Sequence, residues 1–234
     1  FANALSEKTK LVIINSPSNP TGITYSKGDY QVIGKILNDY PQVFIVTDDM
    51  YEYIYWGEDP FVSFAKACPD LFDRTITVNG VSKSYAMTGW RIGYCGGPSQ
   101  VIGAMKKIQS QSTSNPSSIS QAATVAALTG SKEEVYAMVD QYKLRHDYLC
   151  SALNDIDGFK TTQGTGAFYL FPDVKEIISS KGFSDDVELS EFLIEKANVA
   201  VVPGSAFGTP GYIRLSYATS LEMLEDAVNR ISES

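Results

Sequence analysis

Short apolar segments rich in β-branched residues alternate with helical segments over the first part of the chain. Residues 11–15 form such a segment, and the turn-forming cluster at 16–20 ends it. Over residues 26–40 the apolar side chains recur at helical spacing, and Ser26 is a suitable N-cap. Further strands are predicted at 43–47, 75–78 and 92–95. Because strands that are apolar throughout are buried on both faces, the pattern predicts an α/β fold with a three-layer, mostly parallel sheet.

The pattern changes in the second half of the chain. Helices are predicted at 101–110, 118–128 and 132–154, with Gly130 at the break before the third. Short strands are then predicted at 159–161, 167–171, 199–202 and 212–215, mixed with helices at 188–197 and 220–231. This mixture is typical of an α+β module. We therefore predict a large domain over residues 1–129 and a smaller α+β C-terminal domain over residues 130–234.

Charge and residue counts exclude several classes of function. The net charge of −8 argues against binding to nucleic acid or a membrane surface, and no apolar run is long enough to span a bilayer. The three cysteines, Cys68, Cys95 and Cys150, form no CxxC pair, so we expect buried thiols in a reducing, cytoplasmic compartment. The single histidine, His146, lies among polar residues. We expect it to be a solvated helix residue, and we predict no metal site.

Polar side chains follow the predicted strands, at the edge where open parallel sheets bind ligands. Residues 19–22 (Asn-Pro-Thr-Gly) follow the first strand, and Asp48 and Tyr51 follow the second. After the third strand comes Ser82-Lys83, with Arg91 eight residues beyond the lysine. In the C-terminal domain, Arg214 lies near the end of the last strand.

This set of side chains suits one cofactor and one class of substrate. A lysine can attack an aldehyde, and an aspartate can keep a pyridine nitrogen protonated, which makes the ring an electron sink. A phenol and an amide can hydrogen-bond a phenolate oxygen, while arginines bind phosphate and carboxylate groups. The set therefore favours pyridoxal 5′-phosphate (PLP) and an amino acid.

Each feature also has an ordinary structural interpretation. The alternatives are a simple turn at 19–22, a solvated strand end at Asp48, a surface lysine at Lys83, a structural ion pair at Arg91 and a helix or domain contact at Arg214. The joint occurrence of these residues favours the cofactor interpretation.

Taken in order, these segments resemble the class I and II aminotransferases of PLP fold type I. The most specific segment is 82–94, which reads SKSYAMTGWRIGY, and moderately specific ones lie at 19–22, 48–51, 166–169 and 214–218. Segments 110–116 and 214–220 look like those of the bacterial-type aspartate aminotransferases. The resemblance covers essentially the whole chain and implies the large PLP-binding domain of that family, followed by its small domain.

The resemblance implies a role for each candidate residue. Lys83 would hold PLP through a Schiff base, and Asp48 would pair with the ring nitrogen. Asn19 and Tyr51 would contact the O3′ oxygen of the ring, and Ser82 and Arg91 would bind the phosphate. Arg214, together with Asn19, would bind the substrate carboxylate. The implied activity transfers an amino group between an L-amino acid, with aspartate favoured, and a 2-oxo acid such as 2-oxoglutarate, in a homodimer.

Two departures from the family pattern bear on these expectations. Family chains are longer at the N-terminus, and Phe1 precedes the first strand by only a few residues, so we expect a fragment with an incomplete large domain. No arginine occurs between Arg91 and Arg145, where animal-type aspartate enzymes carry the arginine that binds the distal carboxylate. Three alternatives stay open: an aromatic or broad-specificity aminotransferase, a C–S β-lyase, and an aminotransferase-like sensor domain of a regulator.

Overall fold

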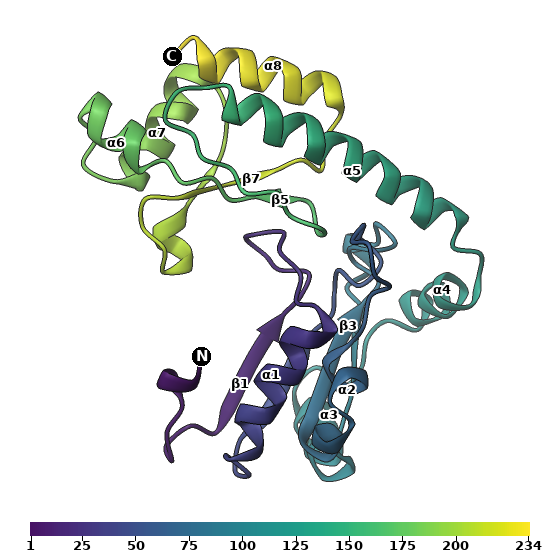
Figure 1. Ribbon diagram of the computed structural model, residues 1–234. Coiled ribbons are helices and arrows are strands. Elements are labelled where there is room, and N and C mark those ends of the chain that lie inside the picture. Colours follow the sequence, from purple (N-terminus) through teal and green to yellow (C-terminus); the bar gives the residue numbers. More distant parts are fainter. The chain divides into compact units, whose positions relative to one another are not determined.

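The computed structural model describes all residues from Phe1 to Ser234 (Figure 1). The chain divides into two compact units: unit 1 comprises Phe1–Pro17 and Thr24–Tyr136, and unit 2 comprises Ser18–Ile23 and Ala137–Ser234. The turn that follows the first strand therefore belongs to the unit built mainly from the C-terminal part. The domain division predicted after residue 129 stays a prediction.

Unit 1 contains a four-stranded sheet in the order β1-β2-β3-β4. Its strands are β1 (Leu11–Asn15), β2 (Phe44–Asp48), β3 (Thr75–Gly80) and β4 (Gly93–Gly96). The first three run parallel, and β4 is antiparallel to β3. Asn15 lies opposite Asp48, and Asp48 lies opposite Val78, so the carboxyl ends of β1, β2 and β3 meet at one edge. The predicted mostly parallel sheet is confirmed.

The helices of unit 1 include three that begin and end close to their predicted positions and a short one, at Phe64–Ala67, that was not predicted. They are α1 (Lys27–Asn38), α2 (Phe64–Ala67), α3 (Ser99–Ser112) and α4 (Ser118–Thr129), with short 3₁₀ helices at Ala2–Ala4, Pro69–Arg74 and Thr88–Trp90. As predicted, Ser26 caps α1: its hydroxyl accepts from Asp29 N at 3.1 Å, and the Asp29 carboxylate accepts from Ser26 N at 2.8 Å. Gly130 ends α4, as predicted, and α5 (Glu133–Asn154) continues from unit 1 into unit 2.

The core of unit 1 packs α1 and α2 against the sheet. Tyr30, Leu37, Ile45 and Phe64 have at most 1% of their surface exposed. The Arg74 guanidinium closes one end of this core by donating to three carbonyl oxygens between the end of α1 and the start of β2, at 2.6 to 2.8 Å. These bonds tie the end of α1 to the start of β2, and one of them goes to Leu37 O in the last turn of the helix.

Unit 2 contains a small antiparallel sheet in the order β5-β7-β6. Its elements are β5 (Tyr169–Leu170), α6 (Lys175–Lys181), α7 (Asp186–Ala197), β6 (Val202–Pro203), a 3₁₀ helix at Gly204–Phe207, β7 (Ile213–Ser216) and α8 (Leu221–Ser232). The predicted α+β character of this part is confirmed. None of the helices in either unit has the length and apolar character needed to cross a bilayer.

The strand predicted at 159–161 is wrong. Only Lys160 forms an isolated bridge, to Asp173. Thr161 is held instead by the Asn154 side chain, which accepts from Thr161 N at 2.7 Å and donates to Thr161 O at 3.1 Å. A side-chain amide therefore takes the hydrogen bonds that a neighbouring strand would otherwise supply.

Two expectations about single residues are also wrong. His146 is 1% exposed, because its ring packs beside Tyr217 and its Nε2 accepts from Gly164 N at 3.0 Å. Cys95 on β4 is half-exposed, whereas Cys68 and Cys150 are buried as predicted; all three thiols are free.

Candidate active site

Asp48 and Tyr51 lie where β2 ends at the carboxyl edge of the unit 1 sheet. The Asp48 backbone oxygen accepts from the Asn15 amide Nδ2 at 3.1 Å, which ties the ends of β1 and β2 together. The Asp48 carboxylate accepts from Met50 N at 3.2 Å, and this contact turns the chain so that Tyr51 becomes buried, with 4% of its surface exposed. The carboxylate itself stays half-buried, so it is accessible at this edge.

The lysine segment follows β3 and is fixed to the turn after β2. The Ser84 hydroxyl donates to the Met50 backbone oxygen at 3.4 Å, and Ser84 is 1% exposed. At the last residue of β3, Gly80, a Cβ atom would lie 2.9 Å from the Ile92 oxygen, so close packing excludes a side chain there. Ser82 and Lys83 are both half-buried. Unit 1 therefore brings Lys83 and the Asp48–Tyr51 turn to the same edge of one sheet.

Arg91 ends the 3₁₀ helix at Thr88–Trp90 in a left-handed backbone conformation, with φ of 56°. A side chain in this region costs about 1–2 kcal/mol, so the position is strained. The guanidinium is exposed, and its Nη1 donates to the Thr88 oxygen at 2.9 Å. Backbone strain of this kind is concentrated at functional sites, which agrees with the predicted role in binding an anion.

Unit 2 holds Asn19 and Arg214 together. Arg214 Nη1 donates to Asn19 Oδ1 at 2.8 Å. The guanidinium carbon of Arg214 lies 4.6 Å from the centre of the Tyr169 ring and 5.1 Å from the centre of the Phe207 ring. Arg214 Nε is buried and donates to no acceptor. A buried donor without an acceptor calls for an explanation, and a carboxylate ligand supplies one.

The turn that carries Asn19 is fixed by backbone contacts within unit 2. The Gly22 oxygen accepts from Thr165 N at 3.0 Å and from Gly166 N at 3.1 Å. Gly22 has φ of +69°, and a Cβ atom there would lie 2.8 Å from the Tyr169 oxygen. Glycine is needed here for its conformation and for this close approach.

Sequence reasoning missed several residues around these groups. Asp49 is 2% exposed, and burial raises its pKa to about 7 despite a hydrogen bond from Thr47. Asp49 is not among the predicted site residues, because its position next to Asp48 at a strand end gives no local signal of burial. Tyr169 and Phe207 flank Arg214, a contact that depends on packing between β5, β7 and the segment after β6.

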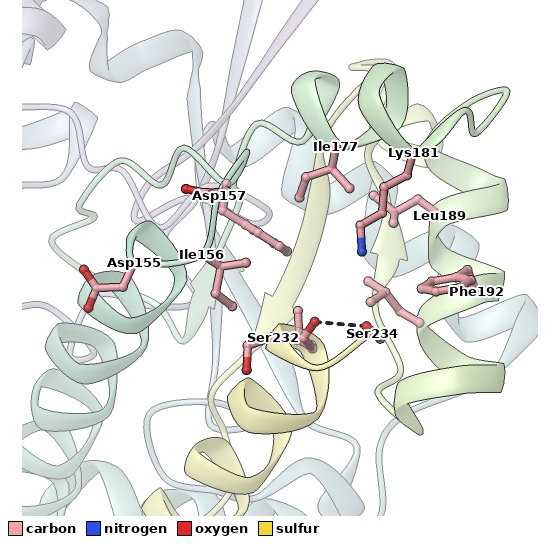
Figure 2. Close-up of a pocket in the computed structure, with 12 residues that line it drawn as sticks. Asp155, Ile156, Asp157, Ile177, Lys181, Leu189, Phe192, Ser232 and Ser234 are labelled. Atoms are coloured by element: carbon pink, nitrogen blue, oxygen red, sulfur yellow. Dashed lines mark hydrogen bonds between the residues drawn. The ribbon is translucent and has the colours of Figure 1, made fainter.

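A cavity of about 350 Å³ also opens in unit 2 and is lined by none of the predicted site residues (Figure 2). Its walls combine apolar side chains such as Ile177, Leu189 and Phe192 with Lys181, whose amine points toward Ser234 in Figure 2. We assign no function to this cavity.

Comparison with known proteins places these residues in a family. The family model of class I and II aminotransferases matches residues 1–231. The aspartate/prephenate aminotransferase of Nitrosomonas europaea is 50% identical over 235 residues, covering 98% of this chain and 59% of that protein. The aspartate aminotransferase of Bacillus subtilis is 45% identical, over 98% of this chain and 58% of that protein.

Solved structures agree with the sequence comparison. The aspartate aminotransferase from Rhizobium meliloti matches with a TM-score of 0.94 and 46% identity, over 99% of this chain and 59% of that one. An aromatic aminotransferase from Pyrococcus horikoshii matches with a TM-score of 0.92 and 37% identity. The chain thus spans about three fifths of the length of these relatives. It belongs to the class I and II aminotransferase family.

Proposed function

We propose that the protein containing this chain is a PLP-dependent aminotransferase that moves an amino group between an L-amino acid and a 2-oxo acid. The observation that carries the proposal is the joining of the Lys83 segment to the Asp48–Tyr51 turn, through Ser84 and Met50, at one sheet edge. Arg214, with a buried Nε that donates to no acceptor, supports a carboxylate-bearing substrate.

The residues of unit 1 fit the chemical groups of PLP. The amine of Lys83 suits the aldehyde, the carboxylate of Asp48 suits the ring nitrogen, and the phenol of Tyr51 suits the O3′ oxygen. The Ser82 hydroxyl and the exposed Arg91 guanidinium suit the phosphate, and the Asn19 amide of unit 2 is a second candidate partner for O3′. When bound, PLP supplies an electron sink for the negative charge that develops at the substrate Cα.

Each of these side chains would then have its own role in the reaction. The Lys83 amine would remove the proton from the substrate Cα and would later return a proton, acting as base and then acid. Asp48, at the end of β2, keeps the ring nitrogen protonated by its negative charge. Arg214 binds the substrate carboxylate through charge-assisted hydrogen bonds, and Asn19 orients the guanidinium through the 2.8 Å contact.

Aspartate is the substrate that we propose, with 2-oxoglutarate as amino acceptor. The Bacillus and Rhizobium relatives are named aspartate aminotransferases, which supports aspartate, and the Nitrosomonas relative is named for prephenate as well. The likeness to an aromatic aminotransferase makes aromatic amino acids the main competing class. A panel of aspartate, aromatic and small aliphatic donors, each with 2-oxoglutarate or prephenate, distinguishes these choices.

Borohydride reduction tests the cofactor assignment directly. We expect the complete protein to be yellow, and reduction followed by peptide mapping to place the cofactor label on Lys83. Lys83→Ala should lose the label, while Lys66→Ala, which alters an exposed lysine on α2, should keep it. A label on another lysine would refute the assignment. Labelled protein that forms a keto acid without transferring the amino group to 2-oxoglutarate would instead indicate a β-lyase.

We also propose that the protein works as a cytoplasmic homodimer. Apolar side chains on α3 and α4 are unusually exposed, with Ile108 at 72% and Ile119 at 79%. Exposed apolar patches support an interface with another protein surface, and the three free thiols support a reducing compartment. Sedimentation equilibrium tests the assembly: a monomer at micromolar concentration would contradict it.

A further inference from the structure

Asp186, the first residue of α7, has a buried carboxylate that does not cap the helix. Its neighbour Asp185 caps α7, and the Asp185 side chain accepts from Val187 N and Glu188 N, each at 2.9 Å. Asp186 is only 1% exposed, although burying an ionised carboxylate is costly unless hydrogen bonds compensate for the lost water. Its position therefore requires partners outside the helix.

Those partners lie in the segment after β6 and include two backbone N–H groups and the Ser205 hydroxyl. The two carboxylate oxygens of Asp186 accept from Ser205 N at 2.7 Å and from Gly211 N at 3.1 Å. Burial acts to raise the pKa of Asp186, but hydrogen bonds from Ser205 and Gly211 outweigh it and hold the pKa below its ordinary value. The carboxylate is therefore the form that fits this place.

Residues 204–212 form a closed loop around this carboxylate, which we call the 204–212 loop. Gly204 N donates to the Tyr212 oxygen at 2.7 Å, and Thr209 N donates to the Gly204 oxygen at 3.0 Å. Asp186 bonds to the loop at both Ser205 and Gly211, on either side of Phe207. One side chain thus fixes both arms of the loop.

The loop places Phe207 against Arg214. The Phe207 ring lies 5.1 Å from the Arg214 guanidinium carbon, and Phe171 supports it edge-on, with ring centres 5.9 Å apart. The Tyr169 ring is the second aromatic neighbour of the same guanidinium, at 4.6 Å. Contacts of a cation with aromatic faces restrict the guanidinium, and a group that is already ordered loses less entropy when it binds its ligand.

We propose that Asp186 is a positioning residue for substrate binding, which anchors the 204–212 loop so that Phe207 holds the Arg214 guanidinium ready for a carboxylate. The inference rests on the proposed function of Arg214. It adds a residue that touches neither substrate nor cofactor and acts through the loop and the Phe207 ring.

The test uses Asp186→Asn in the complete, PLP-loaded protein. The asparagine keeps the shape but turns an N–H group toward one of the two backbone donors, so one hydrogen bond is lost. We expect the Kd of succinate, an unreactive dicarboxylate, to rise roughly two- to fivefold, as for the loss of one cation–π contact. We expect KM for the amino acid to rise alike, with kcat nearly unchanged. Asp185→Asn, which preserves a good helix cap, is the matched control.

A double-mutant comparison separates positioning from general stability. Phe207→Leu should raise the succinate Kd as Asp186→Asn does. The double variant should have a Kd no higher than that of the weaker-binding single variant, because both substitutions act through the contact between Phe207 and Arg214. A lower melting temperature with an unchanged Kd, or effects that add fully, would overturn the proposal.

Two further measurements keep the outcome clear. If Asp186→Asn does not fold, Ser205→Pro removes the Ser205 N–H donor and leaves the carboxylate in place; an unchanged succinate Kd would then refute the inference. Arg214→Ala separates this inference from the proposed function. If Arg214→Ala leaves succinate binding intact, the proposed function of Arg214 fails; if it weakens binding while Asp186→Asn does not, only the role of Asp186 fails.

Discussion

Asp48 and Asp49 are neighbours in the chain, but they lie in different environments. Asp48 is half-buried at the sheet edge and accepts from Met50 N. Asp49 is 2% exposed, and its Oδ1 is buried and has no hydrogen-bond donor. Because successive side chains of an extended chain point to opposite sides, one carboxylate of the pair remains accessible while the other enters the interior.

The buried carboxyl of Asp49 should make stability depend on pH. Its folded-state pKa of about 7 lies above the ordinary value of 3.8, so the folded protein retains the proton between these values while the unfolded chain releases it. The free energy of unfolding should therefore fall as pH rises through this window. Asp49→Asn should flatten that slope and stabilise the protein at pH 8, by about 4 kcal/mol at most.

Urea unfolding at several pH values between 5 and 8 measures this effect. Asp39→Asn, at an exposed position after α1, is the charge-matched control. An Asp49→Asn variant with the same slope as the unmodified protein would show that the Asp49 carboxyl ionises as readily in the folded state as in the unfolded chain.

Arg214 should be far more sensitive to substitution than an ordinary surface arginine. Arg214→Ala removes a charge-assisted contact to the substrate and should weaken amino-acid binding by roughly 2–5 kcal/mol. Arg214→Lys keeps the charge but loses the planar fork, so it should recover only part of the affinity. Steady-state KM values measure both effects, and a lysine variant with full affinity would argue against bidentate binding.

The individual elements show which parts of the fold are determined by residues that lie close together in the chain. β1 and α1 were predictable because β-branched runs and a Ser26 cap act within a few residues. The failed strand at 159–161 and the buried His146 depend on Asn154 and Gly164, which lie several residues or more away in the chain. The placement of Asp48 and Lys83 at one sheet edge was predictable because both follow strands, whereas the contacts of Phe207 and Asp186 depend on loop packing that no local pattern reveals.

His146 connects α5 to the segment 164–166, whose amides at Thr165 and Gly166 bond to the Gly22 oxygen. Gly164 N can only donate, so His146 Nε2 must accept, and the proton on Nδ1 points to Asp147 at 2.9 Å. His146→Leu would leave the buried Gly164 N–H without an acceptor and should cost about 1–3 kcal/mol of stability. Asp147→Asn still accepts from His146 and should cost less than about 1 kcal/mol. Chemical unfolding of both variants gives the comparison, and equal losses would contradict the assigned bond.

At the scale of the whole molecule, the two units are interleaved along the chain. The backbone passes between them after Pro17, after Ile23 and after Tyr136. A substitution in the turn 18–23 should therefore act on unit 2, although the flanking residues on both sides belong to unit 1.

Gly22→Ala tests this interleaving. The new methyl group would meet the Tyr169 oxygen at 2.8 Å in a backbone conformation that disfavours side chains. Hydrogen exchange should accelerate at the Thr165 and Gly166 amides, which bond to the Gly22 oxygen, and change little in the strands of unit 1. Gly28→Ala, whose methyl group meets only ordinary contacts, is the control. Faster exchange confined to β1 and β2 would contradict the division.

The contact between Asn19 and Arg214 joins residues 195 positions apart in the chain. At a synthesis rate of about 5–20 residues per second on a ribosome, roughly 10–40 s pass between the addition of Asn19 and the addition of Arg214. Unit 1 can begin to fold in that interval, whereas the turn 18–23 gains its contacts with unit 2 stepwise, first with Thr165 and Gly166 and then with Arg214. The pair that we assign to the substrate carboxylate thus cannot form until β7 of unit 2 has been synthesised.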